Sequence, residues 1–240
     1  MAKVRVAAHQ PNYMPWQGYF NKLANCDVFV LLDNVQLERR GLTHRTRILG
    51  HRQGDAPWIS QSLKKRAIHE QNILDTQFAD LHWVRKHLNT LKTVYGKARH
   101  FKEMYPALES AMLVNEVRLA DYNTRLIATV AGLLGIRTPM VRASTLCEGT
   151  ACNASERLAA LTRMVGGDVY LSGQGAKAYN DDNVFRRHGV KLEYLQFRPA
   201  PYAQGAAAQF VPNLSVMDAL FHLGPKDTVS LIAKGNHGAR

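Results

Sequence analysis

The continuous apolar run at residues 27–33, "DVFVLLD", constrains the fold of this chain more than any other segment. Aspartates bound the run and its interior has no polar position, which predicts a strand buried on both faces. An alternating segment at 3–8 predicts an earlier short strand, and residues 16–25 between the two carry apolar side chains at helical spacing. Parallel strands need such a crossover, so the order predicts an α/β fold with a parallel sheet.

The alternation of strand and helix returns after residue 137. Segments 138–144, 168–173 and 190–197 predict strands. Residues 153–167 predict a helix that is capped near Asn153 or Ser155 and stopped by Gly166. The Gly-rich turn after residue 172 is expected to lead into another helix, and 213–224 predicts a short last helix.

The middle of the chain interrupts this pattern. Residues 36–66 are basic and turn-rich, which favours an extended hairpin arm with "HRQGDAP" as its turn. From about 70 to 135 the apolar spacing is helical, with Pro106 expected in a first helical turn and Gly135 at an end. We therefore expect an N-terminal α/β half at 1–69, a helical insertion at 70–137, and a C-terminal α/β half at 138–240. The two halves should form one compact Rossmann-like fold.

Composition bears on location and partners. The chain of 240 residues has a formal net charge of +12, which attracts nucleic acid or anionic small molecules without choosing between them. No apolar run could span a membrane and no secretory signal is visible, so we expect a cytoplasmic protein without membrane insertion. Cys26, Cys147 and Cys152 lack metal-type spacing, and we expect no metal site of cysteines and no disulfide framework.

A first group of candidate site residues follows the first predicted strand. His9 and Gln10 leave that strand, prolines stiffen the loop, and Tyr13 and Trp16 precede the helix. An imidazole at a strand end beside a helix N-terminus can bind and neutralise a phosphate. The alternative is that His9 caps the helix and that Trp16 and Tyr19 belong to the core.

A second group follows the buried strand. Asp33 and Gln36 come directly after it, with Arg40, Arg45 and Arg47 in the hairpin arm. Carboxylate and amide groups at a strand end can hold a substrate amine or hydroxyl, and guanidinium groups suit phosphate. The alternative is a solvated basic hairpin in which Asp33 caps a turn.

A third group lies in "YLSGQGAKAY", where Ser172, Gly173, Gly175 and Lys177 separate a predicted strand from a predicted helix. Backbone N–H groups at glycines and a lysine can hold an anion at a helix start. A simple turn is the alternative, because the spacing is that of neither a P-loop nor a complete dinucleotide fingerprint. Asp218, in an apolar helix pattern, either caps locally or faces the site.

Three segments carry a family resemblance. "HQPNYMPWQGYFNKLANCDVFVLLDNVQ", "YLSGQGAKAY" and "FVPNLSVMDALFHLG" resemble the WbqC-like proteins of bacteria, over nearly the whole chain. That resemblance implies a place in the biosynthesis of O-antigen, other surface polysaccharides or natural products. The order of strand, His-containing loop, helix and strand is also similar to the nucleotidylyltransferase and pantothenate synthetase superfamily, which implies nucleotide binding at this loop.

The hypothesis drawn from these features is a transferase or amide-forming ligase. It transfers an acyl or aminoacyl group to the amine of a sugar or aminosugar-like acceptor, through an adenylate made from ATP with Mg²⁺. His9, Asp33 and Gln36 would act at the reacting groups, with Asp33 as base or amine holder and as the candidate Mg²⁺ ligand, while the arginines and Lys177 bind phosphate. Two alternatives stay open: an ATP-independent transferase fed by a tRNA or thioester carrier, and a non-catalytic nucleic-acid-binding or assembly protein.

Overall fold

A single parallel sheet organises the chain in the computed structural model, which describes residues 3–50, 52, 54–64, 71–146, 153–205, 207 and 209–235. Its five strands lie in the order β5-β2-β1-β6-β7, and every neighbouring pair is parallel. The strands are β1 (Arg5–His9), β2 (Val28–Leu31), β5 (Met140–Arg142), β6 (Val169–Gly173) and β7 (Lys191–Leu195). The predicted α/β class is confirmed, and the strand order is that of the first five strands of the doubly wound type.

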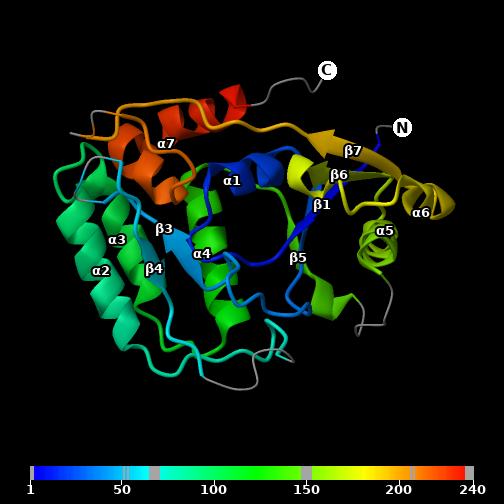
Figure 1. Cartoon of the computed structure of the whole chain (residues 1–240), viewed down its shortest axis with the longest axis horizontal. Coiled ribbons are helices and arrows are strands. Elements are labelled where there is room, and N and C mark those ends of the chain that lie inside the picture. Colours follow the sequence, from blue (N-terminus) through cyan, green and yellow to red (C-terminus); the bar gives the residue numbers. More distant parts are fainter. Residues whose placement is uncertain are drawn as a thin grey trace.

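Helices cover the sheet on both faces. They are α1 (Gln17–Ala24), α2 (His82–Tyr95), α3 (Phe101–Met112), α4 (Leu119–Leu133), α5 (Ala154–Met164), α6 (Asp182–Arg187) and α7 (Val216–Lys234). Figure 1 shows α5 and α6 at one end of the molecule and α2 and α3 at the other, with α4 nearer the middle. No helix in the described part of the chain is long and apolar enough to cross a membrane.

The buried strands divide their side chains between two cores. Ala7 and Phe29 belong to a large cluster with α1, α7 and the three middle helices, whereas Val6, Ala8 and Val30 belong to a smaller cluster with α5 and α6. This alternation is what a strand buried on both faces must show. Because α2, α3 and α4 share the large cluster with α1 and α7, the middle helices pack directly onto the α/β core.

The basic arm forms the expected hairpin. β3 (Arg45–Arg47) pairs antiparallel with β4 (Trp58–Ser60), and Arg47 stands opposite Trp58. The hairpin is fastened to the rest of the fold, since Ser215 donates its backbone N–H to the carbonyl of Arg47 at 2.8 Å. Residues 51 and 53 of the expected turn lie outside the described residues.

The middle segment departs from the prediction in two places. Residues 71–81 are not helical, because tertiary bridges hold them instead: Gln36 pairs with Asn72, and Gln77 with Arg118. Pro106 lies inside α3 rather than in its first turn, because the helix already begins at Phe101. The predicted end near Gly135 is confirmed, and this glycine takes the positive φ of 67° expected after a helix.

The C-terminal third confirms the predicted cap and corrects two helix boundaries. Asn153 caps α5 by accepting the Glu156 N–H at 2.9 Å. The Gly-rich turn forms a short 3₁₀ turn, and α6 begins only at Asp182, so this turn does not open a helix directly. The last helix was expected to end at Gly224, but it only kinks there and resumes to Lys234, which makes it longer than expected.

Candidate functional site

A cavity of about 320 Å³ opens at the carboxyl ends of β1 and β6. Chain order reverses between these neighbours, since β2 and β5 lie on one side of β1 and β6 and β7 on the other. Open α/β sheets bind their ligands at such a switch point. We call it the switch cavity, and it is lined by Ala8, His9, Gln10, Asn12, Lys22, Leu32, Glu38, Leu42, Tyr170, Ser172 and Ala176.

His9, the last residue of β1, presents a neutral imidazole to this cavity. Its Nδ1 lies 3.2 Å from the carbonyl oxygen of Gln10. A carbonyl can only accept, so Nδ1 carries the proton and Nε2 presents its lone pair. No described residue bonds Nε2. Burial lowers the pKa of His9 to about 3, with the charge of Lys22 as a second cause, so the side chain does not supply the positive charge expected of it.

Lys22 of α1 supplies that charge instead. Its Nζ lies 3.5 Å from the carbonyl oxygen of Ala8, and a methyl group placed on Gly173 would lie 3.7 Å from the same nitrogen. Burial lowers the pKa of this amine to about 8. Sequence reasoning missed Lys22, although one signal was present: it follows Gly18 by one helical turn, and helical side chains lean toward the N-terminus, here toward the strand ends.

Other polar side chains of the switch cavity are held in place by neighbours. The Gln10 amide oxygen accepts the Thr43 hydroxyl at 3.0 Å, and the Ser172 hydroxyl accepts from the Asn180 amide at 2.9 Å. Glu38 lines the switch cavity and adds a carboxylate to it, and sequence reasoning did not single out this residue. His9, Gln10 and Ser172, which were predicted as parts of two separate groups, line this one cavity.

The two glycines at the end of β6 and just after it continue the site, but Lys177 does not. Gly173 and Gly175 line an adjoining hollow of about 200 Å³ that also contains His9, Lys22 and Trp16. Lys177 is exposed and lies in the lining of neither. The start of α6 is also closed to an anion, because the Asp181 carboxylate accepts the Asn183 N–H at 2.9 Å.

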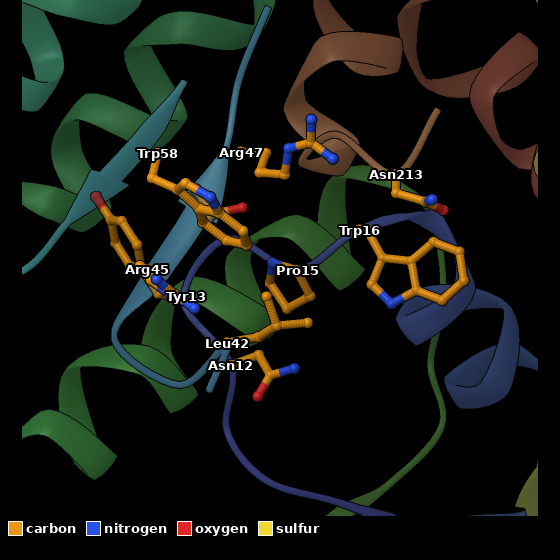
Figure 2. A pocket seen from close by; sticks show the side chains of 10 residues that line it. Asn12, Tyr13, Pro15, Trp16, Leu42, Arg45, Arg47, Trp58 and Asn213 are labelled. Carbon is orange, nitrogen blue, oxygen red and sulfur yellow. The ribbon is translucent and has the colours of Figure 1, made fainter. Parts of the chain in front are cut away.

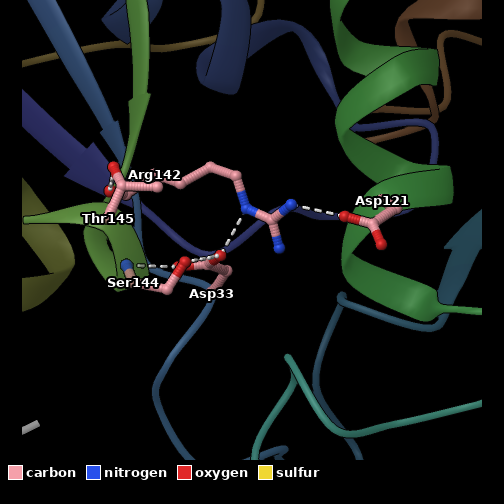
Figure 3. Close-up of polar contacts among 5 residues, drawn as sticks. All are labelled: Asp33, Asp121, Arg142, Ser144 and Thr145. Carbon is pink, nitrogen blue, oxygen red and sulfur yellow. Dashed lines mark hydrogen bonds and ion pairs between the residues drawn. The ribbon is translucent and has the colours of Figure 1, made fainter. Parts of the chain in front are cut away.

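Asp33 is placed in an ion-pair network beside the site (Figure 3). It is 0% exposed; its Oδ1 accepts the Ser144 N–H at 2.9 Å, and its Oδ2 accepts the Ser144 hydroxyl at 2.7 Å and Arg142 Nε at 2.5 Å. Arg142 also pairs with Asp121 of α4. Both carboxylate oxygens are therefore engaged in joining the ends of β2 and β5, and Asp33 does not line the switch cavity. This placement does not support a role as base or Mg²⁺ ligand.

The hairpin contributes to a second hollow, which we call the hairpin hollow. This hollow of about 310 Å³ is lined by Asn12, Tyr13, Pro15, Trp16, Leu42, Arg45, Thr46, Arg47, Trp58 and Asn213 (Figure 2). Asn12 and Leu42 also line the switch cavity, so the two spaces adjoin. Besides Asp33 and Lys177, two further predicted residues line neither these spaces nor the hollow beside Gly173: Arg40 is exposed, and Gln36 is exposed and bridges to Asn72.

Tyr13 contributes mainly to the core. It is 1% exposed, its hydroxyl lies 2.9 Å from His87 Nδ1, and its ring meets Trp83 edge to face at 5.7 Å. Trp16, by contrast, lies at the surface of two hollows and packs over Gly18, where an added methyl group would lie 2.4 Å from the indole. Tyr13, which was predicted to bind substrate, therefore belongs mainly to the core, whereas Trp16 is partly buried against the core and also lines two hollows. Tyr19, the other aromatic residue that the alternative placed in the core, is 1% exposed.

No group of three or more His, Cys, Asp or Glu side chains within the described ranges is arranged to hold a metal ion. Cys26 is a free, buried thiol whose pKa burial raises to about 12. Cys147 and Cys152 lie outside the described residues. Asp218 does not line the switch cavity; it lies in a buried network in which its Oδ1 accepts the Tyr202 hydroxyl at 2.6 Å.

The profile of the WbqC-like protein family matches residues 10–230, which include the hairpin hollow and all of the switch-cavity lining except Ala8 and His9. The chain belongs to the WbqC-like family. It is also 30% identical over 221 residues to the uncharacterized protein Rv1507c of Mycobacterium tuberculosis (strain ATCC 25618 / H37Rv), covering 92% of this chain and 94% of that one. No solved structure gives a significant match. The matched region of this WbqC-like chain begins at Gln10, within the loop that joins the two hollows.

Proposed function

We propose that this protein is an enzyme that transfers an acyl or aminoacyl group from an activated carboxylic acid to the amine of a sugar or aminosugar-like acceptor. One observation carries the proposal: a neutral imidazole with an unpartnered Nε2 lies beside a lysine in the switch cavity. An amine loses a proton as it becomes an amide, and the leaving group gains negative charge. A proton acceptor can take the proton from the amine, and a cation beside it can stabilise the charge on the leaving group.

In the proposed step the amine nitrogen attacks the carbonyl carbon of the activated acid. The C–N bond forms, the bond from that carbon to the leaving oxygen breaks, and Nε2 of His9 takes the proton released by the amine. The ammonium of Lys22 stabilises the charge on the leaving group. A pKa of about 3 makes His9 a weak base in the free protein, but an anionic donor beside it raises that pKa, because nearby negative charge favours the imidazolium.

Activation by ATP is part of this proposal. The Lys22 ammonium and the backbone of Gly173–Gly175 are groups of the kind that hold phosphate, and ATP when bound supplies the activation of the acid. Mg²⁺ normally accompanies such phosphates through one or two carboxylates. Glu38 fits that role better than Asp33, because Glu38 lines the cavity and both oxygens of Asp33 are already bonded.

A second route is favoured by the charge beside the cavity. Arg45 and Arg47 line the adjoining hairpin hollow, and the chain carries a net charge of +12. Such a surface also suits a donor delivered on a tRNA, for which no ATP would be needed.

The test is product formation from a panel of aminosugars and amino acids, with ATP or with a charged carrier, followed by mass spectrometry. ATP-dependent product with release of AMP or pyrophosphate supports the first route, and product from the carrier alone supports the second. His9→Gln should lower turnover about 100-fold or more, as loss of a general base does. His82→Gln, at an exposed histidine on α2, is the matched control.

Lys22→Gln should also lower turnover, and Lys226→Gln at an exposed lysine of α7 should not. Failure of both donor classes, together with nucleic-acid binding that falls steeply with salt and is unchanged in His9→Gln, would instead establish a non-catalytic binding protein.

A further inference from the structure

We propose that the hairpin hollow binds the phosphorylated nucleoside portion of the group donor, with the base held against Trp58 and Trp16 and the phosphate against Arg45 and Arg47. The place of this ligand in the reaction rests on the proposed function, whereas its binding does not. Figure 2 shows the two indoles at opposite ends of the hollow, with Pro15 between them.

The positive charge of the two arginines in the hollow favours an anionic ligand. Arg45 and Arg47 stand two residues apart on β3, so they share one face of the hairpin. Neither forms an ion pair with a described carboxylate, and no Asp or Glu lines the hollow. Arg45 Nε is buried without a hydrogen-bond partner in the described structure. Two uncompensated guanidinium groups, one with a free donor, match the oxygens of a phosphate.

The two tryptophans that line the hollow favour a ligand with a planar ring. Trp58 is 45% exposed, although its position is fixed: the Arg45 guanidinium lies 4.2 Å and that of Arg47 5.9 Å from its ring centroid. Trp16 is fixed as well, by an edge contact with Phe197 at 5.5 Å. Rigid, partly exposed indoles stacked with arginine are the features on which nucleic-acid bases stack.

Asn12 connects this ligand to the reacting groups. Its side chain is 2% exposed, its Oδ1 has no partner, and it lines both the hairpin hollow and the switch cavity. A buried acceptor without a donor costs free energy unless a ligand or water satisfies it. An amino group on the base or a sugar hydroxyl supplies that donor. A nucleotide in the hairpin hollow therefore abuts the space that contains His9.

The shared chemistry, a base with a phosphate, can come from a free nucleotide or from the end of an RNA carrier. Tryptophan fluorescence of the full-length protein reports binding in the hollow, because Trp16 and Trp58 line it and Trp83 is buried in the core. Comparing a free nucleotide with an RNA as the probe then separates the two sources. We expect saturable quenching by AMP or by a short single-stranded RNA ending in adenosine. Adenosine should bind more weakly than AMP, and inorganic phosphate should not quench. Tighter binding of the RNA than of AMP at equal salt would identify the carrier as the source.

Variants assign the binding to this hollow. Trp58→Leu should weaken AMP binding about tenfold, as loss of one stacking partner does. Because Trp58 is 45% exposed, this substitution should leave the fold intact. Arg45→Gln should weaken binding and flatten its dependence on salt. Trp83→Phe should retain the quenching. Equal affinity in wild type and Trp58→Leu, measured by calorimetry, would overturn the inference, as would absence of binding by both nucleotide probes.

Failure of this inference is distinguishable from failure of the proposed function. His9→Gln should bind AMP as the wild type does while losing turnover. Nucleotide binding that depends on Trp58 in a protein without transferase activity would leave the site standing and refute the reaction. Turnover that is unaffected by Trp58→Leu, at any donor concentration, would leave the reaction standing and refute the placement of the donor in this hollow.

Discussion

Replacing Asp33 with asparagine should destabilise the fold far more than it impairs chemistry. The buried carboxylate accepts the Ser144 N–H, the Ser144 hydroxyl and Arg142 Nε. Asparagine retains one acceptor and turns an N–H₂ group toward the remaining donors. Breaking a fully buried ion pair costs about 3–5 kcal/mol, but Arg142 is 28% exposed and keeps Asp121, so about 2–4 kcal/mol is expected here.

This loss corresponds to a fall in Tm of about 5–15 °C for a chain of this size. Urea unfolding with a fluorescence readout measures the free energy of unfolding, and Asp121→Asn is the matched control on the same arginine. Asp121 is 30% exposed, so its loss should cost at most about 1 kcal/mol. An Asp33→Asn protein with unchanged Tm and no turnover would show that Asp33 acts at the reacting groups, which the present placement contradicts.

Three further predictions concern packing, titration and capping. Gly18→Ala places a methyl group 2.4 Å from the Trp16 indole, so it should cost about 1–3 kcal/mol and shift the tryptophan emission; an unchanged spectrum would contradict this packing. The pKa of His9 is lowered from 6.5 to about 3, so the unfolded state binds more protons between these values and stability should fall as pH falls through this window. His9→Gln should remove part of that acid destabilisation, on the order of 5 kcal/mol at most, whereas His82→Gln should not. Asn153→Ala removes the bond from the Glu156 N–H and should lower stability by about 1 kcal/mol with turnover intact, measured by urea unfolding and the transfer assay.

Local sequence patterns were sufficient for much of the fold. The unbroken apolar run at 27–33 predicts β2 and its burial on both faces, and Asn153 marks the start of α5 through its own side chain. The prediction of a helix at residues 71–81 was wrong because these residues form β-bridges to residues 36 and 118. Both partners lie far away in the sequence, so no local pattern reveals them. Helix α7 was underestimated for a similar reason: Gly224 breaks the helix, but Leu231 and Ile232 beyond it are still buried.

The site was predictable only where chemistry and strand ends coincide. His9, Gln10 and Ser172 converge because parallel strands place their carboxyl ends at one edge. The role of Asp33 was not predictable, since its partner Arg142 is separated from it by 109 positions. Lys177 was predicted because it follows two glycines. The lysine that lines the cavity is Lys22, which belongs to no such motif and is identified by its burial and its place on α1.

The central claim is that the imidazole of His9 in the switch cavity takes the amine proton during transfer. The most direct measurement is single-turnover amide formation by His9→Gln and His82→Gln proteins, at saturating donor and acceptor and with folding verified by circular dichroism. The structure predicts a rate at least about 100-fold below wild type for His9→Gln and an unchanged rate for His82→Gln. A wild-type rate in a folded His9→Gln protein would contradict the assignment of this cavity as the active site.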